Sequence, residues 1–321
     1  MQRVLATLPK VWENEVQSAM DMLKSKGYSV ELVWSDNGLP EEELIRLIKG
    51  KHAYIVCVDT VSKRVIEHAD SLKVLAKHGV GVDNIDIKAA TEKKIAVCNT
   101  PGANAHAVAD LTLGLIIEIT RKLSDSDKLA RKGIFSKPTG IELNKKTLGI
   151  IGFGAIGKQV AIRARAFGLE ILAYDMIHDD SFADEYGVKY SNIDEILNNC
   201  DILTLHLPLT PETKGLINRE AIKKMKKTAY IVNAARGGIV DEDAVADALI
   251  NGELQGAAFD VFSKEPPDLN SKIFSAPNVH FCTHIAGSTI EAIQRGTEMA
   301  AQNVIDFLEG KAVKSVVNCF T

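Results

Sequence analysis

The sequence predicts an α/β protein built from two doubly wound, parallel-sheet domains. Short apolar segments alternate with helix-like segments in two separate series, one over the first hundred residues and one from Thr147 onward. Such alternation is typical of mostly parallel sheets with helices on both faces. The length of 321 residues fits two domains, because one domain usually takes about 100–200 residues.

The first series has clear helix stops at Gly27 and Gly50, where glycine follows a helical pattern. Apolar runs between the helical segments predict strands. We expect strands at 4–6, 30–33, 53–58, 73–76 and 95–98, and helices at 13–26, 41–49 and 63–69.

A turn cluster, Asn99–Asn104, breaks this rhythm and is followed by a long helical pattern. Apolar residues such as Val108, Leu111 and Leu115 recur there at helical spacing, which predicts one helix over 105–132. The second series follows, with strands expected at 147–151, 170–174, 202–205, 229–232, 257–259 and 279–281, and helices at 155–167, 193–197, 219–225, 242–250 and 289–308.

The turn cluster and the segment His284–Ser288 are candidate hinges between the domains. A last helix after the second hinge can return to the first domain, which would make that domain discontinuous in sequence. We therefore expect a flavodoxin-like domain from residues 1–100 plus 287–321, and a Rossmann-like domain from residues 101–286.

Charge and hydropathy argue against several kinds of partner. The net charge is −4, and the short run Lys223–Lys227 is interpreted as the solvated end of a helix, so no basic surface for nucleic acid is expected. No apolar stretch reaches the ~20 residues that span a bilayer, and the N-terminus lacks a secretory apolar segment. We expect a soluble, cytoplasmic protein without membrane partners.

The cysteines are scattered, without the spacing of zinc or redox sites. We expect reduced, mostly buried thiols and no metal site; the five are Cys57, Cys98, Cys200, Cys282 and Cys319.

The sharpest local pattern is Gly-x-Gly-x-x-Gly at Gly152, Gly154 and Gly157, between an apolar strand and a helix. The first glycine permits a tight turn, the second lets the backbone approach a pyrophosphate, and the third lets the helix pack on the strand. The helix N-terminus, with Ala155 and Ile156, offers free N–H groups to phosphates. The alternative is a turn without a ligand, but strand, glycines and helix in register favour a dinucleotide site.

An acidic residue about 20 positions beyond such glycines contacts the adenosine ribose. Asp175 stands there, at the end of the next predicted strand. Its carboxylate would repel a 2′-phosphate, and no arginine follows it, so the sequence favours NAD over NADP.

Three later strands end in residues suited to hydroxyl oxidation. Arg236, Glu265 and His284 follow them, offering a planar cation for carboxylates, a partner for histidine, and a general acid–base. Taken singly, each has a structural interpretation, as an ion pair, a surface acid or a helix cap. Ligands of open α/β sheets bind at the carboxyl ends of the strands, so the set points to one active site.

The surrounding motifs resemble those of D-isomer-specific 2-hydroxyacid dehydrogenases. They are Asn-Ala-Ala-Arg-Gly-Gly at 233–238, Asp-Val-Phe-x-x-Glu-Pro at 260–266, His-Ile-Ala-Gly-Ser-Thr at 284–289, Gly79–Asp86 and Asn99–Asn104. The resemblance runs in order from about residue 50 to the end of the chain.

This resemblance implies a role for each residue. His284 would be the general acid–base, Glu265 its hydrogen-bond partner, and Arg236 a ligand of the substrate carboxylate and carbonyl. Backbone N–H groups of Val80 and Gly81 would hold the carboxylate, with His78 beside them. The cofactor would also be lined by His206, Leu207, Pro208, Thr213, Ala234, Ala235, Asp260 and Gly287. The helix after Pro101 resembles the family's dimerisation element, so a homodimer is expected.

The sequence departs from the family pattern in two places. Thr283 stands where proline often precedes the histidine, and Ala155 stands where an arginine is frequent near the pyrophosphate. The first departure affects the local backbone before the histidine. The second removes one possible contact with a phosphate.

The substrate stays open among 3-phosphoglycerate, glyoxylate or hydroxypyruvate, and a bulkier 2-keto acid. Phosphoglycerate dehydrogenases resemble the chain most through Gly79–Asp86 and rank first by a small margin, yet the stretch 56–60 lacks the arginine that some of them use for phosphate. Lys63, Arg64 or Lys77 would have to replace it. The alternative function is an NADH-sensing, corepressor-like binding protein on the same fold.

Overall fold

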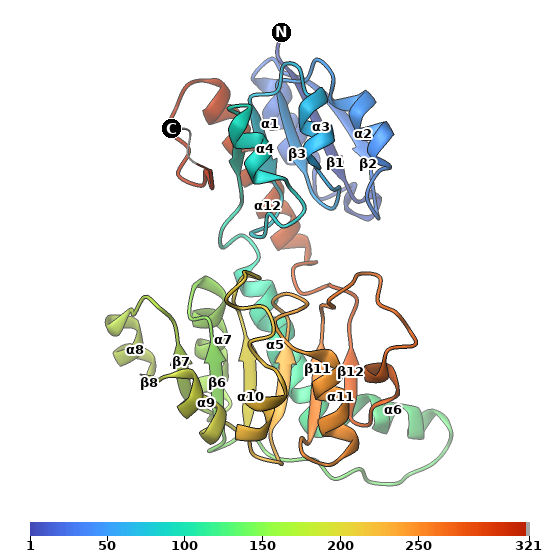
Figure 1. Cartoon of the computed structure of the whole chain (residues 1–321), viewed down its shortest axis with the longest axis vertical. Coiled ribbons are helices and arrows are strands. Elements are labelled where there is room, and N and C mark those ends of the chain that lie inside the picture. The colour runs from blue at the N-terminus through green and yellow to red at the C-terminus, as the bar shows by residue number, and fades with distance from the viewer. Residues whose placement is uncertain (319–321) are drawn as a thin grey trace. The chain divides into compact units, whose positions relative to one another are not determined.

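The structure, a computed structural model, describes residues 1–318 and divides into two compact units. Unit 1 comprises Met1–Asn104 and the stretch that begins at Ser288, and unit 2 comprises Ala105–Gly287. The chain therefore passes from one unit to the other at the two segments that the sequence marks as hinges (Figure 1). The expected Cys319 lies outside the described residues.

Unit 1 is a five-stranded parallel sheet in the order β2-β1-β3-β4-β5, which is the flavodoxin-like order. Helices α1 and α12 pack together on one side of it, and α2, α3 and α4 follow one another in a second layer. Its elements are β1 (Arg3–Leu8), the 3-10 turn η1 (Lys10–Trp12), α1 (Gln17–Ser25), β2 (Ser29–Trp34), α2 (Glu41–Ile48), β3 (Ala53–Val56), α3 (Lys63–His68), β4 (Val74–Lys77), α4 (Ile87–Glu92), β5 (Ala96–Cys98) and α12 (Ile290–Leu308).

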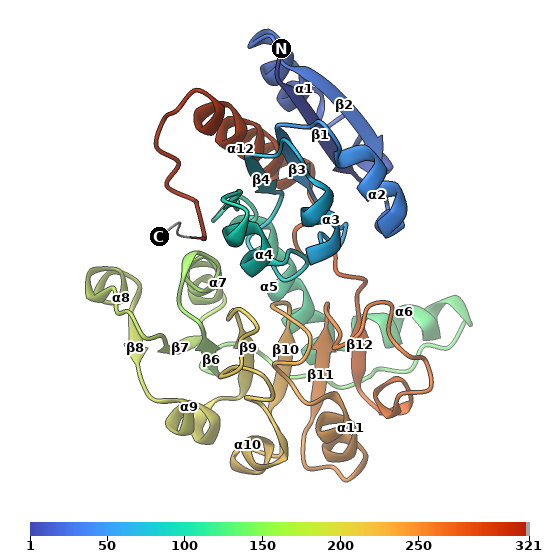
Figure 2. The same ribbon diagram turned by 45° about the horizontal axis from the view of Figure 1, so that its top comes forward.

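Unit 2 is a seven-stranded parallel sheet in the order β12-β11-β10-β9-β6-β7-β8. Figure 2 shows α9, α10 and α11 on one face of this sheet and α5 and α7 on the other. Its elements are α5 (Ala105–Arg121), α6 (Leu123–Arg131), β6 (Thr147–Ile151), α7 (Ala155–Ala166), β7 (Glu170–Tyr174), α8 (Asp180–Tyr186), β8 (Val188–Tyr190), α9 (Ile193–Asn199), β9 (Ile202–Leu205), α10 (Arg219–Lys224), β10 (Tyr230–Asn233), α11 (Glu242–Ile250), β11 (Gly256–Phe259), the 3-10 turn η2 (Lys272–Ser275) and β12 (Val279–Phe281).

The order of strands in unit 2 is that of a Rossmann fold with one added edge strand, β12. The chain reverses direction across the sheet between the neighbouring strands β6 and β9. Ligands of such sheets bind at this reversal, outside the carboxyl ends of the strands. The prediction of two doubly wound parallel sheets, one of them discontinuous in sequence, is confirmed.

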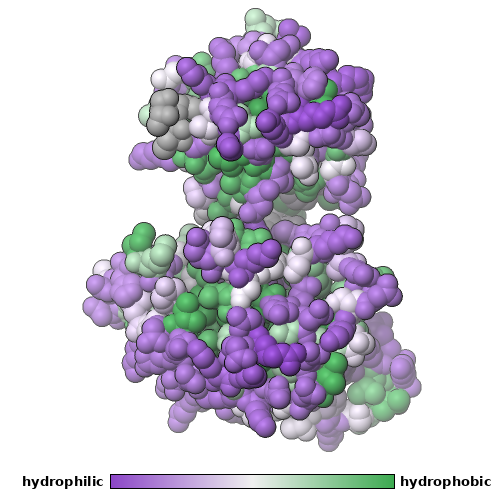
Figure 3. Space-filling model, in the orientation of Figure 1, coloured by the Kyte–Doolittle hydropathy of each residue, from purple (hydrophilic) through white to green (hydrophobic). Residues whose placement is uncertain are grey.

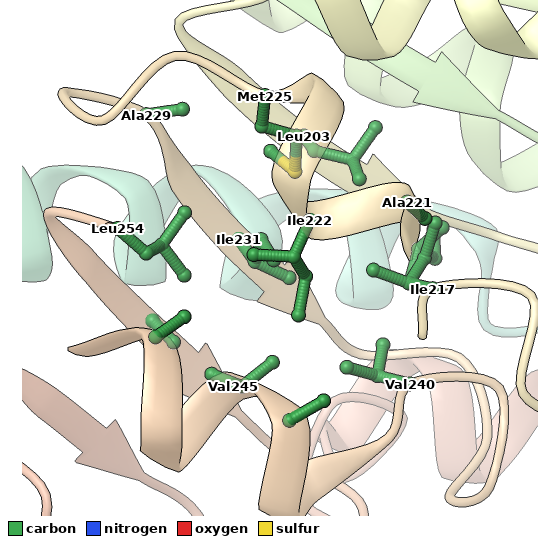
Figure 4. Close-up of a cluster of buried hydrophobic side chains, with 14 of the residues drawn as sticks. Leu203, Ile217, Ala221, Ile222, Met225, Ala229, Ile231, Val240, Val245 and Leu254 are labelled. Carbon is green, nitrogen blue, oxygen red and sulfur yellow. The ribbon is translucent and has the colours of Figure 1, made fainter. Parts of the chain in front are cut away.

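Each unit has its own buried core. In unit 2, α10 and α11 cover β9 and β10 with aliphatic side chains, as the close-up in Figure 4 shows. Leu203, Ile222, Ile231 and Val245 are at most 3% exposed there. A rigid sheet therefore supports the loops at its carboxyl edge.

Polar caps define where many helices begin. Side chains of Ser, Asp, Asn or Thr accept a backbone N–H at the start of α3, α4, α8, α9, α10, α11 and α12.

The prediction of one helix over residues 105–132 is wrong. Lys122 has a left-handed backbone, with φ 54° and ψ 46°, and separates α5 from α6. The structure also adds α4, α8 and β8, which the sequence patterns did not indicate. No helix among residues 1–318 is both long and apolar enough to cross a membrane.

Candidate active site

The glycine loop joins β6 to α7 at the carboxyl edge of the unit 2 sheet. Gly152 has φ 96°, and a Cβ there would lie 2.6 Å from the backbone of His206, so only glycine fits. Gly154 and Ala155 are exposed, and a Cβ at Gly154 would meet nothing within 4 Å. With Ile156 and Gly157 in the first turn of α7, this open backbone fits the pyrophosphate of a dinucleotide at a helix N-terminus.

Asp175 follows β7, one strand away from the glycine loop. Its Oδ2 accepts the N–H of Phe153 at 2.7 Å, and its Oδ1 accepts the N–H of Ile177 at 3.1 Å. The carboxylate therefore also anchors the glycine loop, a structural role that the sequence pattern did not indicate.

His284 and Glu265 form a hydrogen-bonded pair. The Nδ1 of His284 donates to Oε2 of Glu265 at 2.7 Å, which leaves Nε2 as the ring nitrogen that can exchange a proton. Burial raises the pKa of Glu265, but the hydrogen bond and charge of His284, the Phe262 N–H and the charge of Arg236 outweigh it and hold this pKa below its ordinary value.

The backbone of His284 is left-handed, with φ 58°, which is uncommon for a residue other than glycine. Asp260 holds it there: its carbonyl accepts the His284 N–H at 2.8 Å, and its carboxylate accepts the N–H groups of Ile285 and Ala286 at 2.8 and 2.9 Å. Asp260 itself is fully buried. This residue thus orients the histidine, and its predicted contact with the cofactor stays a prediction.

Arg236 lies in the loop after β10, which Asn233 organises. The amide of Asn233 donates to the Arg236 carbonyl at 2.9 Å and accepts the Ala235 N–H at 3.1 Å. The guanidinium of Arg236 donates to the Ala235 carbonyl at 2.7 Å and lies close enough to Glu265 to lower its pKa. Ala234 and Ala235 are nearly buried in this turn.

The loop after β9 holds His206, Leu207, Pro208 and Thr213. The Thr213 hydroxyl donates to the Pro208 carbonyl at 2.7 Å and accepts the N–H of Thr210 at 2.8 Å, so this loop is internally braced. Burial lowers the pKa of His206 to about 3, and within the described part of the chain its Nδ1 has no hydrogen-bond partner.

In unit 1, the residues expected to hold a carboxylate lie on a loop that starts after β4. Thr100 pins the loop at Gly79, where its hydroxyl accepts the Gly79 N–H at 2.8 Å. Asn99 donates to the Val80 carbonyl at 2.8 Å, and Val80 is 40% exposed. The motif Asn99–Asn104 therefore positions Val80 and Gly81. His78 is largely buried beside the ring of Trp12, at 4.9 Å between centroids.

Within unit 2, the glycine loop, Asp175, the loop after β9, Arg236, Glu265, His284 and Gly287 all follow the carboxyl ends of parallel strands. Asn233, Glu242 and Ser263 support this edge. Asn233 opens the motif at 233–238, but the sequence analysis assigned no role to any of the three. No cluster of His, Cys, Asp and Glu among residues 1–318 could hold a metal ion.

A Rossmann sheet with this glycine loop, an acid after its second strand and a His–Glu pair defines the class of dinucleotide-dependent dehydrogenases. Comparison with known proteins narrows the class. The family model of the D-isomer specific 2-hydroxyacid dehydrogenase NAD binding domain matches residues 113–286, more than half of the chain.

A glyoxylate reductase of Thermofilum pendens is 40% identical over 320 residues, which cover 97% of this chain and 94% of that protein. A D-3-phosphoglycerate dehydrogenase of Methanocaldococcus jannaschii is 43% identical over 285 residues, but the chain spans only 54% of its length. A D-lactate dehydrogenase of Aquifex aeolicus, solved with NAD and lactic acid, superposes with a TM-score of 0.83 at 32% identity, covering 96% of each chain.

The chain belongs to the D-isomer specific 2-hydroxyacid dehydrogenase family. Unit 2 is its NAD-binding domain, and NAD is the cofactor of this family domain.

Proposed function

We propose that this protein interconverts a small D-2-hydroxy acid and its 2-keto acid, with His284 as the acid–base residue. The observation that carries the proposal is the 2.7 Å hydrogen bond between His284 and Glu265, at the sheet edge that also carries the glycine loop and Arg236. NAD, when bound, supplies the hydride acceptor for C2 of the hydroxy acid.

The residues of the chain manage the proton and the charges. As C2 loses its hydride, Nε2 of His284 takes the hydroxyl proton, while Glu265 stabilises the positive charge that forms on the ring. Arg236 binds the carboxylate and polarises the C2 oxygen. The N–H groups of Val80 and Gly81 hold the substrate carboxylate. In the reverse direction His284 returns the proton to the carbonyl oxygen.

The cations of unit 1 bear on whether the substrate carries a phosphate group. Arg64 is already paired with Glu41 at 3.0 Å and with Glu42. Lys63 lies 3.9 Å from Glu67, and the ammonium of Lys77 donates to the Cys57 carbonyl. Each cation that could replace the missing phosphate ligand thus has a protein partner, which favours an unphosphorylated acid such as glyoxylate or hydroxypyruvate.

The stretch 56–60 also contains an acidic residue, Asp59, which is part of the fold. Asp59 is fully buried, and its carboxylate accepts the Ser35 hydroxyl at 2.9 Å and the Leu39 N–H at 2.6 Å. It presents no charge to a substrate. Phosphohydroxypyruvate stays the second candidate, because the relative from Methanocaldococcus jannaschii is a D-3-phosphoglycerate dehydrogenase at 43% identity.

The test follows NADH oxidation with glyoxylate, hydroxypyruvate, phosphohydroxypyruvate and pyruvate. We expect turnover with an unphosphorylated acid, and a His284→Ala loss of about 10²- to 10⁴-fold in kcat with NADH affinity retained. His68→Ala, which changes an exposed histidine on α3, is the matched control. NADH binding without turnover on any acid would instead support the NADH-sensing, corepressor-like function.

We also propose a homodimer formed through the segment after Pro101. Helix α6 has no buried residue, and Leu123, Ile134 and Phe135 on and after it are 48%, 48% and 89% exposed. Hydrophobic residues in the region of α6 also stand out at the lower right of Figure 3. Apolar side chains gathered on a projecting segment are typical of an interface.

The molecular mass in solution tests this interface. We expect a dimer for the native protein and a monomer for Phe135→Asp, whereas Val11→Asp, at an 81% exposed position in unit 1, leaves the dimer intact. A native protein that stays monomeric at every concentration would overturn the proposal.

The thiols fit a reducing compartment, which supports a cytoplasmic location. Cys57, Cys98 and Cys200 are free and buried, and burial raises their pKa to about 11, 12 and 12. Such thiols are inert, because the reactive form is the thiolate.

A further inference from the structure

Glu265 lies on a loop without regular secondary structure, between β11 and the turn η2. The carboxylate uses one oxygen for His284 and the other for the N–H of Phe262, at 3.0 Å. The orientation of the pair therefore depends on what holds Phe262–Glu265 in place.

One anchor comes from Glu242, the first residue of α11. Its Oε1 accepts both the N–H of Ser263, at 2.6 Å, and the hydroxyl of Ser263, at 2.7 Å. Hydrogen bonds to an ionised carboxylate are roughly twice as strong as neutral ones. Helix α11 is firmly seated, because Val245 and Ala246 are fully buried and Asp241 caps its start.

A second anchor comes from Gly237. A Cβ at this position would lie 1.8 Å from the carbonyl oxygen of Phe262, so the two loops touch through their backbones. Phe262 also packs against the rings of Phe274 and Phe281, with centroids 5.7 and 5.9 Å away. The loop bearing Glu265 is thus pressed against the segment that directly follows Arg236.

Both anchors start from residues 237–242, immediately after Arg236 in the chain. The segment that carries the substrate-binding arginine therefore also fixes the loop of the carboxylate partner. A displacement of about 1 Å in an active site can cost about 10²-fold in rate. The two hydrogen bonds from Ser263 to Glu242, called the clamp below, therefore have kinetic consequences.

We propose that Glu242 is a positioning residue that acts through Ser263 to hold Glu265 against His284. The proposal rests on the function proposed above. Glu242 touches neither reacting atom in this assignment; it fixes the backbone from which Glu265 reaches the histidine.

The experiment compares Glu242→Ala with Asp243→Ala. Both variants remove one negative charge from the first turn of α11, but Asp243 is exposed and stands outside the clamp. We expect Glu242→Ala to lower kcat by about tenfold to a hundredfold, with NADH affinity nearly unchanged, and Asp243→Ala to behave as the native enzyme. Glu242→Gln, which keeps an acceptor oxygen, and Ser263→Ala, which keeps the N–H, should fall between them.

The pH dependence separates positioning from a general loss of stability. In Glu242→Ala the midpoint of hydroxy-acid oxidation should move to lower pH, as in Glu265→Gln, because a displaced carboxylate no longer stabilises the protonated ring. In the Glu265→Gln background, Glu242→Ala should have little further effect on kcat, because the clamp then has no carboxylate to position. An equal kcat loss in both backgrounds would overturn the proposal.

The ring signal of His284 can be titrated by NMR without turnover. This measurement therefore still tests the clamp if the native protein reduces no 2-keto acid and the proposed function fails. A shift of the midpoint to lower pH in Glu242→Ala, absent in Asp243→Ala, still supports the clamp, and identical midpoints in native protein and both variants overturn it.

Discussion

At the end of β7, the carboxylate of Asp175 accepts backbone N–H groups from Phe153 and Ile177 at 2.7 and 3.1 Å. Its position after the second strand of the Rossmann sheet also suits the adenosine ribose. The two roles differ in what they require. Holding the glycine loop needs an acceptor oxygen, whereas excluding a 2′-phosphate needs a negative charge.

Asp175→Asn and Asp175→Ala separate these roles. Asparagine keeps an acceptor for Phe153 but removes the charge, so we expect NADPH affinity to rise by about tenfold or more while NADH affinity changes little, since like charges in contact cost several kcal/mol. Alanine also releases the glycine loop, so both cofactors should bind more weakly than to the asparagine variant. Binding titrations with NADH and NADPH measure this. An unchanged NADH to NADPH preference in Asp175→Asn would contradict the charge role.

The placement of Arg236, Glu265 and His284 after strand ends could be predicted from the motifs, and His284 is hydrogen-bonded to Glu265 in the structure. Their roles with substrate and cofactor stay predictions. Glu242 and Ser263 are 21 residues apart; Glu242 lies outside the motifs and Ser263 occupies a variable position in one, so only the folded structure brings them together. Asp260 follows a strand as expected, yet its full burial could not be inferred from sequence.

At the scale of elements, periodicity failed where a helix changes direction without glycine or proline. Ten residues of α5 are buried, and none of α6, although Leu123 of α6 continues the helical spacing of Ile119 in α5. The break at Lys122 rests on a left-handed backbone, which costs a residue with a Cβ roughly 1–2 kcal/mol and leaves no mark in the sequence. The missed α4, α8 and β8 have seven residues or fewer. A periodic pattern over so few residues is a weak signal, although the equally short α3, α9 and α10 were predicted.

Helix α12 passes His78 at Gly296. A Cβ on Gly296 would lie 2.6 Å from Nε2 of His78, and the histidine ring has little room to retreat, because it packs on Trp12 and lies 3.3 Å from the Ile293 carbonyl. His78 directly precedes the Gly79–Gly81 loop. Gly296 thus determines how closely α12 approaches that loop.

We expect Gly296→Ala to destabilise the protein by about 1–3 kcal/mol, as overpacking does. His78→Ala should relieve most of this cost in the double variant, because the two side chains would collide with each other. Gly114→Ala on α5, where a Cβ meets nothing within 4 Å, should instead stabilise by about 0.5–1 kcal/mol. Urea unfolding of these four variants and of the native protein measures the free energies of unfolding. Additive effects of Gly296→Ala and His78→Ala would show that the collision is not the cause.

At the scale of the whole molecule, each unit holds one partly buried histidine whose pKa burial lowers strongly. Burial lowers the pKa of His78 in unit 1 to about 4 and that of His206 in unit 2 to about 3. In the unfolded chain both titrate near 6.5. Below that pH the unfolded chain binds protons that the native protein does not, so the free energy of unfolding decreases as the pH falls.

Carboxylates affect stability in a lower range of pH. Burial raises the pKa of Asp201 and Glu265, but their hydrogen bonds and cationic neighbours outweigh it and lower the pKa below the ordinary 3.8 and 4.5. Between about pH 6.5 and 5 these groups are ionised in both states, and the histidines alone of these four change the balance. Their stabilising contribution is complete above pH 6.5 and is lost as the pH falls toward about 4 and 3.

Both tryptophans, Trp12 and Trp34, belong to unit 1, so their fluorescence follows the unfolding of the unit that contains His78. We expect His78 to make the free energy of unfolding by this probe fall by up to about 1.4 kcal/mol per pH unit below pH 6, the limit for one proton. Burial also lowers the pKa of His52 in unit 1, which adds to the slope. His78→Gln should therefore reduce the slope without abolishing it, whereas the exposed control His68→Gln should leave it unchanged. In His78→Gln, the free energy of unfolding followed by circular dichroism, which reports on both units, should still decrease as the pH falls, because His206 remains. Equal slopes for His78→Gln and His68→Gln by fluorescence would mean that His78 is protonated in the folded state.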